Sequence, residues 1–156
     1  MRWLIVPGGL TVWFTMLHDV DQTRRSQFAA RFKRLLHMIE GSCHCGAIRF
    51  VFLQTPEWLT RCNCSQCRRS AALWAHSTRE NIKLTYAPDD AIHYVWGDKS
   101  LATVSCKRCG CTTHWENLDP SPTARMAVNT NMADPIVIKG LRIRLFDGAD
   151  TWKFLN

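Results

Sequence analysis

From residue 47 onward, short apolar runs alternate with polar turn signals along the chain. The first run, 47–53, alternates small or basic residues with Ile, Phe and Val, and it follows directly on a pair of cysteines. Later runs are separated by Pro88-Asp89-Asp90 and by Gly97-Asp98. Strand-length runs at this spacing are typical of an all-β domain. We expect strands at 47–53, 82–86, 92–96, 101–105, 112–116, 125–129 and 141–146. We also expect an extended piece at 58–61, one helical turn at 68–72, a loop at 119–122 and an irregular tail from 148.

The first 37 residues do not share this pattern. Residues 1–20 are apolar but are interrupted by Pro7-Gly8-Gly9, which is too broken for a membrane-spanning helix. They also lack the small-residue cleavage site of a signal peptide. Residues 21–37 space five basic residues among apolar ones, as in a basic amphipathic helix. A flexible arm, or sequence upstream of a true start at Met38, explains them more simply. We expect 1–37 to be an N-terminal extension and 38–156 to be the domain.

All eight cysteines fall into three clusters, which indicates metal ligation rather than packing. The clusters are Cys43-His44-Cys45, Cys62-Asn63-Cys64-Ser65-Gln66-Cys67 and Cys106-Lys107-Arg108-Cys109-Gly110-Cys111. A structural zinc takes four protein ligands, whereas a catalytic zinc takes three and keeps one position open. The middle cluster offers three close sulfurs. The outer clusters can offer two each, which is enough for one four-sulfur site.

Four disulfides in a secreted protein are the alternative use of eight cysteines. Pairs spaced C-x-C and C-x-x-C are too close in sequence for ordinary bridges within themselves, and no clear secretory signal precedes them. We therefore expect metal. Because metal ligation needs reduced thiols, we expect a cytoplasmic location.

The formal net charge of +7 raises the question of a nucleic-acid partner. Residues 1–37 carry six Lys/Arg and two Asp/Glu, and the domain carries fourteen against eleven, which leaves it +3. Seven metal-bound thiolates and two zinc ions would add −7 and +4 and bring the domain to about neutral. Net charge therefore gives no support for binding to nucleic acid.

The three clusters resemble those of the glutathione-dependent formaldehyde-activating enzyme family, which shares its domain with centromere protein V. The resemblance rests on Gly41–Ala47, Cys62–Arg68, Cys106–Gly110 and the tail from Asn129 to Trp152. It covers about residues 38–156 and none of 1–37.

This resemblance implies a mainly β, Mss4-like β-tent built from short antiparallel strands around two zinc ions. By the family's pattern, the structural zinc is held by Cys43, Cys45, Cys106 and Cys109. The catalytic zinc is held by Cys62, Cys64 and Cys67. The family's type enzyme joins glutathione and formaldehyde to give S-hydroxymethylglutathione, which is carbon–sulfur lyase chemistry. The implied partner is a small thiol adduct.

Several other residues near the clusters have more than one interpretation. Cys111 exceeds the family's seven ligands, and we expect a small packing residue, although a spare ligand or a free thiol is the alternative. His44 and His114 could touch a site, but ordinary exposed or packed histidines explain them more simply. Arg68 and Arg69 could bind a substrate carboxylate or could lie on a solvated turn.

Two classes of function are compatible with the sequence. The first is a zinc-dependent carbon–sulfur lyase that acts on a thiol–aldehyde adduct. The second is a non-catalytic module that contacts protein or chromatin and in which both zinc ions are structural. A second site with an open position favours the enzyme, and a closed four-ligand site favours the module.

Overall fold

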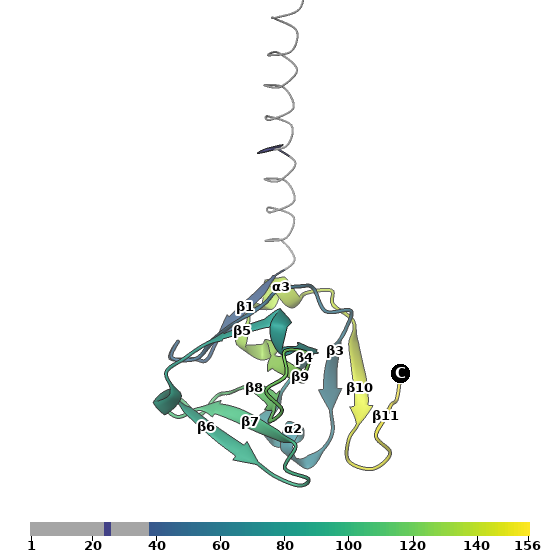
Figure 1. Cartoon of the computed structure of the whole chain (residues 1–156). Helices are drawn as coiled ribbons and strands as arrows, with labels where there is room; N and C mark the ends of the chain where they lie inside the picture. Colours follow the sequence, from purple (N-terminus) through teal and green to yellow (C-terminus); the bar gives the residue numbers. More distant parts are fainter. Residues whose placement is uncertain (1–23, 26–37) are drawn as a thin grey trace, which may run out of the picture. The chain divides into compact units, whose positions relative to one another are not determined.

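The structure is a computed structural model that describes residues 24–25 and 38–156 (Figure 1). Residues 24–25 are helical, and the expectations for the rest of 1–37 lie outside the described residues. Among the described helices, none combines the length and the apolar character needed to cross a membrane. The account below concerns residues 38–156.

Eleven strands form two sheets in this domain. The strands are β1 Ile39–Ser42, β2 Arg49–Phe52, β3 Leu59–Cys62, β4 Trp74–Thr78, β5 Ile82–Thr85, β6 Ala91–Val95, β7 Leu101–Cys106, β8 Thr112–Asn117, β9 Arg125–Asn129, β10 Ile143–Asp147 and β11 Lys153–Phe154. The small sheet has the order β1-β2-β5, and the large sheet has the order β11-β10-β3-β4-β9-β8-β7-β6. All pairings are antiparallel except that of β3 with β10 (Figure 1). The mainly β fold expected from the family resemblance is confirmed.

Helical structure is limited to short pieces between strands. These are α2 Ser65–Ser70, α3 Pro135–Ile138, η1 Arg79–Asn81, η2 Pro88–Asp90 and η3 Thr130–Met132. Of these, α2 follows β3 directly and carries Cys67, so it belongs to the middle cysteine cluster.

The large sheet has one face toward the main core and one face toward a cavity. Alternation along β4 and β9 places Ala75 and Val128 opposite each other, and both are fully buried in the core. The same alternation places His76 opposite Ala127, and Ala127 opposite Trp115, on the other face. Side chains on a strand alternate between faces, so every second residue of these strands reaches the cavity face.

The small sheet closes the core from the other side. In β2, Phe50 and Phe52 are buried, whereas Arg49, the first residue of the strand, is exposed. Their rings join Leu59, Met126 and Val128 of the large sheet in one apolar cluster. Burial of one such aromatic side chain contributes about 1.5–3 kcal/mol.

Most of the strands expected from the sequence are present, and three were missed. The alternating or β-branched runs correspond to β2, β3 and β5 to β10 within a few residues. The helical turn expected at 68–72 is wrong in its bounds, because α2 begins at Ser65, where the Cys64 side chain caps it. The tail from 148 is not wholly irregular, because β11 pairs with β10. β1 and β4 were also missed.

Candidate metal centre and adjoining cavity

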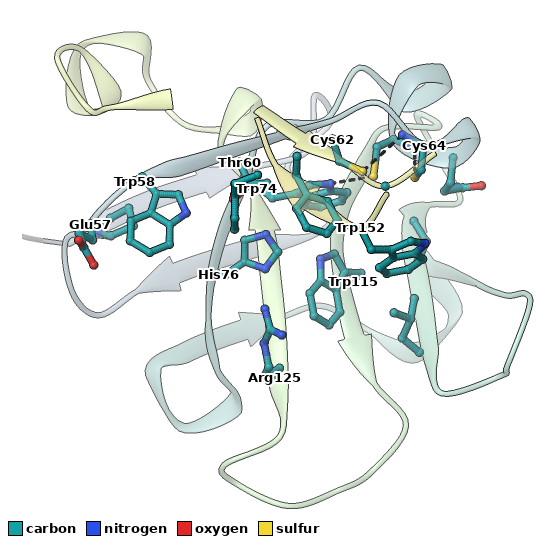
Figure 2. Close-up of a pocket in the computed structure, with 18 residues that line it drawn as sticks. Glu57, Trp58, Thr60, Cys62, Cys64, Trp74, His76, Trp115, Arg125 and Trp152 are labelled. Carbon is teal, nitrogen blue, oxygen red and sulfur yellow. Dashed lines mark hydrogen bonds between the residues drawn. The ribbon is translucent and has the colours of Figure 1, made fainter. Parts of the chain in front are cut away.

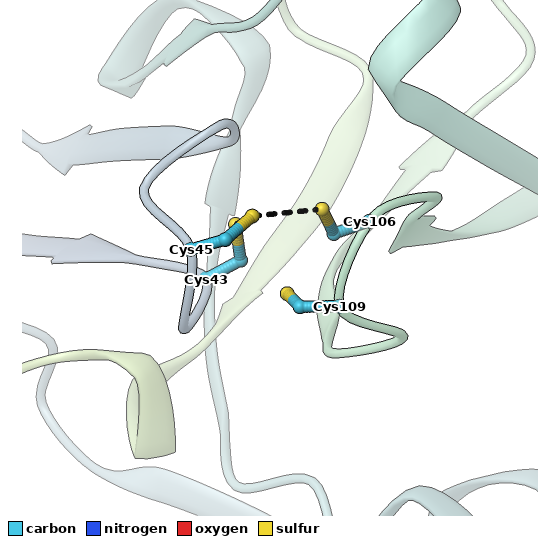
Figure 3. Close-up of side chains that lie close together, drawn as sticks. All are labelled: Cys43, Cys45, Cys106 and Cys109. Atoms are coloured by element: carbon cyan, nitrogen blue, oxygen red, sulfur yellow. Dashed lines mark hydrogen bonds between the residues drawn. The ribbon is translucent and has the colours of Figure 1, made fainter.

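In the described chain, cysteine sulfurs lie together in two groups, one of four and one of three, as expected from the sequence. The first contains Cys43, Cys45, Cys106 and Cys109, whose sulfur atoms all lie within 4.8 Å of one another. Cys43 and Cys45 lie on the turn between β1 and β2, Cys106 ends β7, and Cys109 lies on the turn that follows it (Figure 3). The group therefore ties the small sheet to the large sheet across 61 residues of sequence.

Each of these two turns is closed by a glycine with a left-handed backbone. Gly46 has φ +76° and Gly110 has φ +73°, a region that L-residues with a side chain rarely occupy. The amide of Gly46 donates to the Cys43 carbonyl at 2.9 Å, and the amide of Gly110 donates to the Cys106 carbonyl at 2.8 Å. The repeated turn brings two sulfurs from each segment to a common point.

The sulfurs of the first group perturb each other's pKa values. The backbone amides of Cys111 and Cys45 favour the thiolate of Cys109 and lower its pKa to about 5. An amide hydrogen bond from Ala47 also favours the Cys45 thiolate, but burial and bonds with the other cysteines outweigh it, and the pKa of Cys45 rises to about 12. A bound cation would favour the thiolate at every one of these sulfurs.

The second group contains Cys62, Cys64 and Cys67, again with all sulfurs within 4.8 Å. Cys62 ends β3, Cys64 is the N-cap of α2, and Cys67 lies within that helix. All three are partly exposed, whereas the first group is mixed: Cys43 and Cys106 are buried, Cys109 is partly exposed and Cys45 is exposed. Each sulfur of the second group is therefore partly accessible.

Hydrogen bonds organise the second group. The hydrogen bond from Cys67, together with the amides of Cys64 and Gly148, lowers the pKa of Cys62 to about 5, against the effect of burial. The same bond with Cys62, together with burial, raises the pKa of Cys67. The indole Nε1 of Trp74 donates to Cys67 Sγ at 3.1 Å, which fixes that sulfur from the neighbouring strand β4.

A loop that follows β10 packs closely on this group. A Cβ at Gly148 would lie 2.6 Å from Cys62 Sγ, so only glycine allows this approach. Asn63, between two of the cysteines, donates from Nδ2 to Asp147 Oδ1 at 2.7 Å and accepts from the Ala149 amide at 3.0 Å. Hydrogen bonds from Asn63 and Thr151 lower the pKa of Asp147 to about 2. The carboxylate thus joins the cysteine turn to the 148–152 loop.

A cavity of about 660 Å³ opens beside the second group. Its lining includes the sulfur-bearing residues Cys62, Cys64 and Cys67, and none of the first group. Figure 2 shows Cys62 and Cys64 at one end, with Trp152 beside them, and Arg125 below His76 and Trp115 on the sheet face. The remaining lining residues are Pro56, Glu57, Trp58, Thr60, Gln66, Trp74, Leu101, Thr103, Phe146, Gly148 and Phe154. The volume is in the range of pockets that bind small molecules, roughly 300–1,000 Å³.

Two rings, separated by the small residue Ala127, form the floor of the cavity. His76 and Trp115 lie on either side of Ala127 in adjacent strands, with ring centroids 5.7 Å apart. Desolvation, and then the charge of Arg125, lowers the pKa of His76 to about 4. His76 is therefore neutral at pH 7.

Both sulfur groups suit a metal ion by their donor chemistry. Four convergent thiols from two glycine-closed turns are a typical donor set for a closed, tetrahedral zinc site. Three convergent thiols at the end of a cavity leave space for a further ligand, as in sites where zinc acts on a substrate. The described chain thus offers two groups that could each hold a metal ion.

The other residues singled out from the sequence have these positions. Cys111 packs beside Cys43, Ile48 and Cys106 and is not in the four-sulfur group. His44 is exposed, and His114 is buried against Tyr86, 5.7 Å away, in neither group. Arg68 and Arg69 are exposed on α2 and do not line the cavity.

Residues that sequence reasoning missed complete the site. They are Trp74 and Arg125, which reach the second group or its cavity from β4 and β9, whereas Gly148, in the loop after β10, lies in a stretch already singled out from the sequence. The tail from Asn129 to Trp152 was recognised as resembling the family. That similarity was the one signal that pointed to Gly148.

Comparisons with known proteins agree with this geometry. The sequence model of the glutathione-dependent formaldehyde-activating enzyme family matches residues 38–139. A curated protein of Halomonas elongata named for that activity is 54% identical over 35 residues, which is 22% of each chain. This match thus spans about a fifth of the relative. A crystal structure of a Rhodobacter sphaeroides protein superposes with TM-score 0.54 at 25% identity, and covers 67% of this chain and 98% of that one.

The family match covers the first strand, both sulfur groups and the strands that carry the cavity floor. It therefore includes all of the residues that the cysteine spacing singled out as ligands. The chain belongs to the glutathione-dependent formaldehyde-activating enzyme family.

Proposed function

We propose that this protein is a zinc-dependent carbon–sulfur lyase that forms or cleaves a thiol–aldehyde adduct of the S-hydroxymethylglutathione kind. One observation carries the proposal: the three-cysteine group lines the cavity of about 660 Å³, and the four-cysteine group lies outside it. Family membership supports an enzyme of this type.

The two groups have different roles in this proposal. Cys43, Cys45, Cys106 and Cys109 hold a structural zinc that joins the two sheets. Cys62, Cys64 and Cys67 hold a second zinc at the end of the cavity. When bound there, zinc supplies a Lewis acid that favours the thiolate form of a substrate sulfur.

The reaction itself needs little further machinery. The substrate sulfur attacks the aldehyde carbon, a carbon–sulfur bond forms, and the π electrons of the carbonyl move onto its oxygen. The proton lost from the thiol ends on that oxygen, and cleavage is the reverse. The protein holds the sulfur end in place, because Trp74 fixes Cys67 and the Gly148 loop packs on Cys62.

A non-catalytic module is the alternative function. It would need a closed second site with a fourth protein ligand, and the second group contains three sulfurs in the described chain. The adjoining cavity has no purpose in a purely structural site. The observed geometry therefore favours the enzyme.

The test follows hemithioacetal formation and breakdown with the zinc-loaded protein, glutathione and formaldehyde or other aldehydes. We expect wild type to exceed the uncatalysed rate and Cys64→Ser to lose that excess. Cys111→Ser is the matched control, because Cys111 lies outside both sulfur groups, and it should keep the activity. Equal rates for wild type and Cys64→Ser with every thiol tried would contradict the proposal.

The proposal also implies a cellular setting. Seven cysteines must remain reduced to bind metal, so we place the protein in a reducing compartment, the cytoplasm.

A further inference from the structure

The walls of the cavity indicate what kind of substrate it binds, given the proposed function. Four of the chain's seven tryptophans line it: Trp58, Trp74, Trp115 and Trp152. Phe146 and Phe154 add two more rings. Rings of this kind bind flat apolar groups by stacked or edge-on contacts.

Two polar side chains of the lining have a hydrogen-bonding atom that a ligand cannot reach, whereas Glu57, Gln66 and Arg125 are exposed. Thr60 Oγ1 and His76 Nδ1 are buried within the wall and have no hydrogen-bond partner in the described part of the chain. Because these atoms are covered, a ligand in the cavity gains no hydrogen bond from them. A peptide-like ligand, rich in amide groups, would leave those of its polar atoms that face the aromatic rings unpaired.

The cavity lining contains one arginine, Arg125, and one carboxylate, Glu57. Arg125 forms none of the ion pairs found among the described residues, whereas Arg79 and Arg108 are each paired with a carboxylate. Figure 2 shows Arg125 below His76, with Glu57 beside Trp58 at another end of the cavity. An unpaired arginine on an aromatic wall is suited to one carboxylate.

Trp152 is held in an unusual conformation at the cysteine end. Its φ is +56°, in the left-handed region that a bulky residue rarely occupies. The residue is 73% exposed, and its ring contacts Phe146 edge-on at a centroid distance of 6.0 Å. Strained backbone of this kind is concentrated at binding sites. The ring is therefore available to cover a ligand beside the second sulfur group.

The strand register sets the distance between the cysteine end of the cavity and Arg125. Trp74, which contacts Cys67, is four residues along β4 from Thr78, and Thr78 pairs with Arg125. At about 3.3 Å per residue, Trp74 and the pair Thr78–Arg125 are about 13 Å apart along the strand. The long side chain of Arg125 covers part of this distance, and Trp115 and His76 lie between. One flat ring fits between the sulfur end and the guanidinium.

We infer that the thiol half of the substrate carries a flat aromatic group with one carboxylate, rather than the peptide of glutathione. Its sulfur would lie at Cys62, Cys64 and Cys67, its ring between Trp152 and Trp115, and its carboxylate at Arg125.

Calorimetric titration of the zinc-loaded full-length protein, without aldehyde and under anaerobic conditions, tests this inference. The ligands are 4-(mercaptomethyl)benzoate, phenylmethanethiol without the carboxylate, 3-mercaptopropionate without the ring, and glutathione. We expect the first to bind at least tenfold more tightly than glutathione. Tighter binding of glutathione would overturn the inference. Zinc content is measured after each titration to exclude stripping of the metal.

Variants assign the two contacts separately. Trp152→Ala should weaken both ring-bearing ligands about three- to tenfold and leave 3-mercaptopropionate unchanged. Arg125→Gln should weaken only the carboxylate-bearing ligands. Trp96→Ala and Arg142→Gln are the matched controls, because both residues are exposed outside the cavity. If each variant behaves like its control, the inference is wrong. Trp152→Gly, which suits a positive φ, replaces Trp152→Ala if that loop is disturbed.

The binding measurements separate this inference from the proposed function. Selective binding of the aromatic acid without any catalysed adduct formation would support the ligand class and contradict the lyase. Catalysis with glutathione, together with weak binding of the aromatic acid, would support the lyase and contradict the ligand class.

Discussion

Gly148 determines how closely the loop after β10 approaches the second sulfur group. Its amide favours the thiolate of Cys62, and its missing side chain leaves room for that sulfur. The adjacent Asp147 is fixed by Asn63 and Thr151, so the loop cannot move aside freely. The site therefore requires a residue without a side chain at position 148.

We predict that Gly148→Ala lowers the metal content from two zinc ions to one per chain while the fold is retained. The added methyl carbon would lie 2.6 Å from Cys62 Sγ and 3.3 Å from Cys64 Cβ, so this group must open. Elemental analysis and circular dichroism measure the two properties. Gly97→Ala is the control, because no atom lies within 4 Å of a Cβ there, although its φ of +66° costs about 1 kcal/mol or more. Two zinc ions in Gly148→Ala would show that the cysteine turn can shift.

At this scale, the sequence predicted the residues whose spacing is local and missed those that meet across the fold. The division of cysteines into four and three could be read from C-x-C and C-x-x-C spacing, and the sulfurs do meet in those groups. Trp74 and Arg125 could not be found in this way. They come from strands distant in sequence, and only the register of β3, β4 and β9 brings them to the same face.

Among the elements, β4 lies between β3 and β9 in the large sheet and supplies both Trp74 and His76. It was missed because Trp-Ala-His-Ser-Thr has neither a β-branched run nor an apolar alternation. Its buried position is decided by its neighbours rather than by its own propensity. Strands such as β2 and β9, whose own residues carry the pattern, were predictable.

The strand β8 buries a histidine whose titration should make the fold sensitive to acid. Desolvation, and then the charges of His93 and Arg79, lowers the pKa of His114 to about 3, whereas an unfolded histidine titrates near 6.5. Between these values the unfolded chain binds a proton that the fold does not. The free energy of unfolding therefore falls as pH falls, by up to about 1.4 kcal/mol per pH unit.

We predict that between pH 7.5 and 5.5 the wild type loses about 1 kcal/mol more stability than His114→Phe. Denaturant unfolding of both zinc-loaded proteins at the two pH values measures this difference. His76, with a pKa lowered to about 4, acts in the same direction and is common to both proteins. Parallel losses in the two proteins would show that His114 becomes protonated without cost in the fold.

At the scale of the whole molecule, the four-sulfur group links the small sheet to the large one, and the described domain begins with β1 of the small sheet. We propose that residues 38–156 fold without residues 1–37. A chain that starts at Met38 should fold, bind two zinc ions and keep the activity of the full chain. Metal analysis, circular dichroism and the adduct assay compare the two. Loss of solubility or of metal on truncation would show that 1–37 stabilise the domain.

The two sulfur groups should differ in what their loss does to the molecule. Cys109→Ser removes a ligand from the group that joins the sheets, and binding of structural zinc is coupled to folding. We expect its melting temperature to fall by about 10 °C or more, since about 3 kcal/mol has at least this effect on a domain of this size. Cys64→Ser removes a ligand beside the cavity, where α2 and the 148–152 loop are the elements affected. It should lose one zinc and the activity, with a smaller fall in melting temperature. Calorimetry and metal analysis of both variants, with Cys111→Ser as the control, measure this contrast. An equal loss of stability in the two variants would mean that both groups hold the fold together, and the division into a structural and a catalytic site would be wrong.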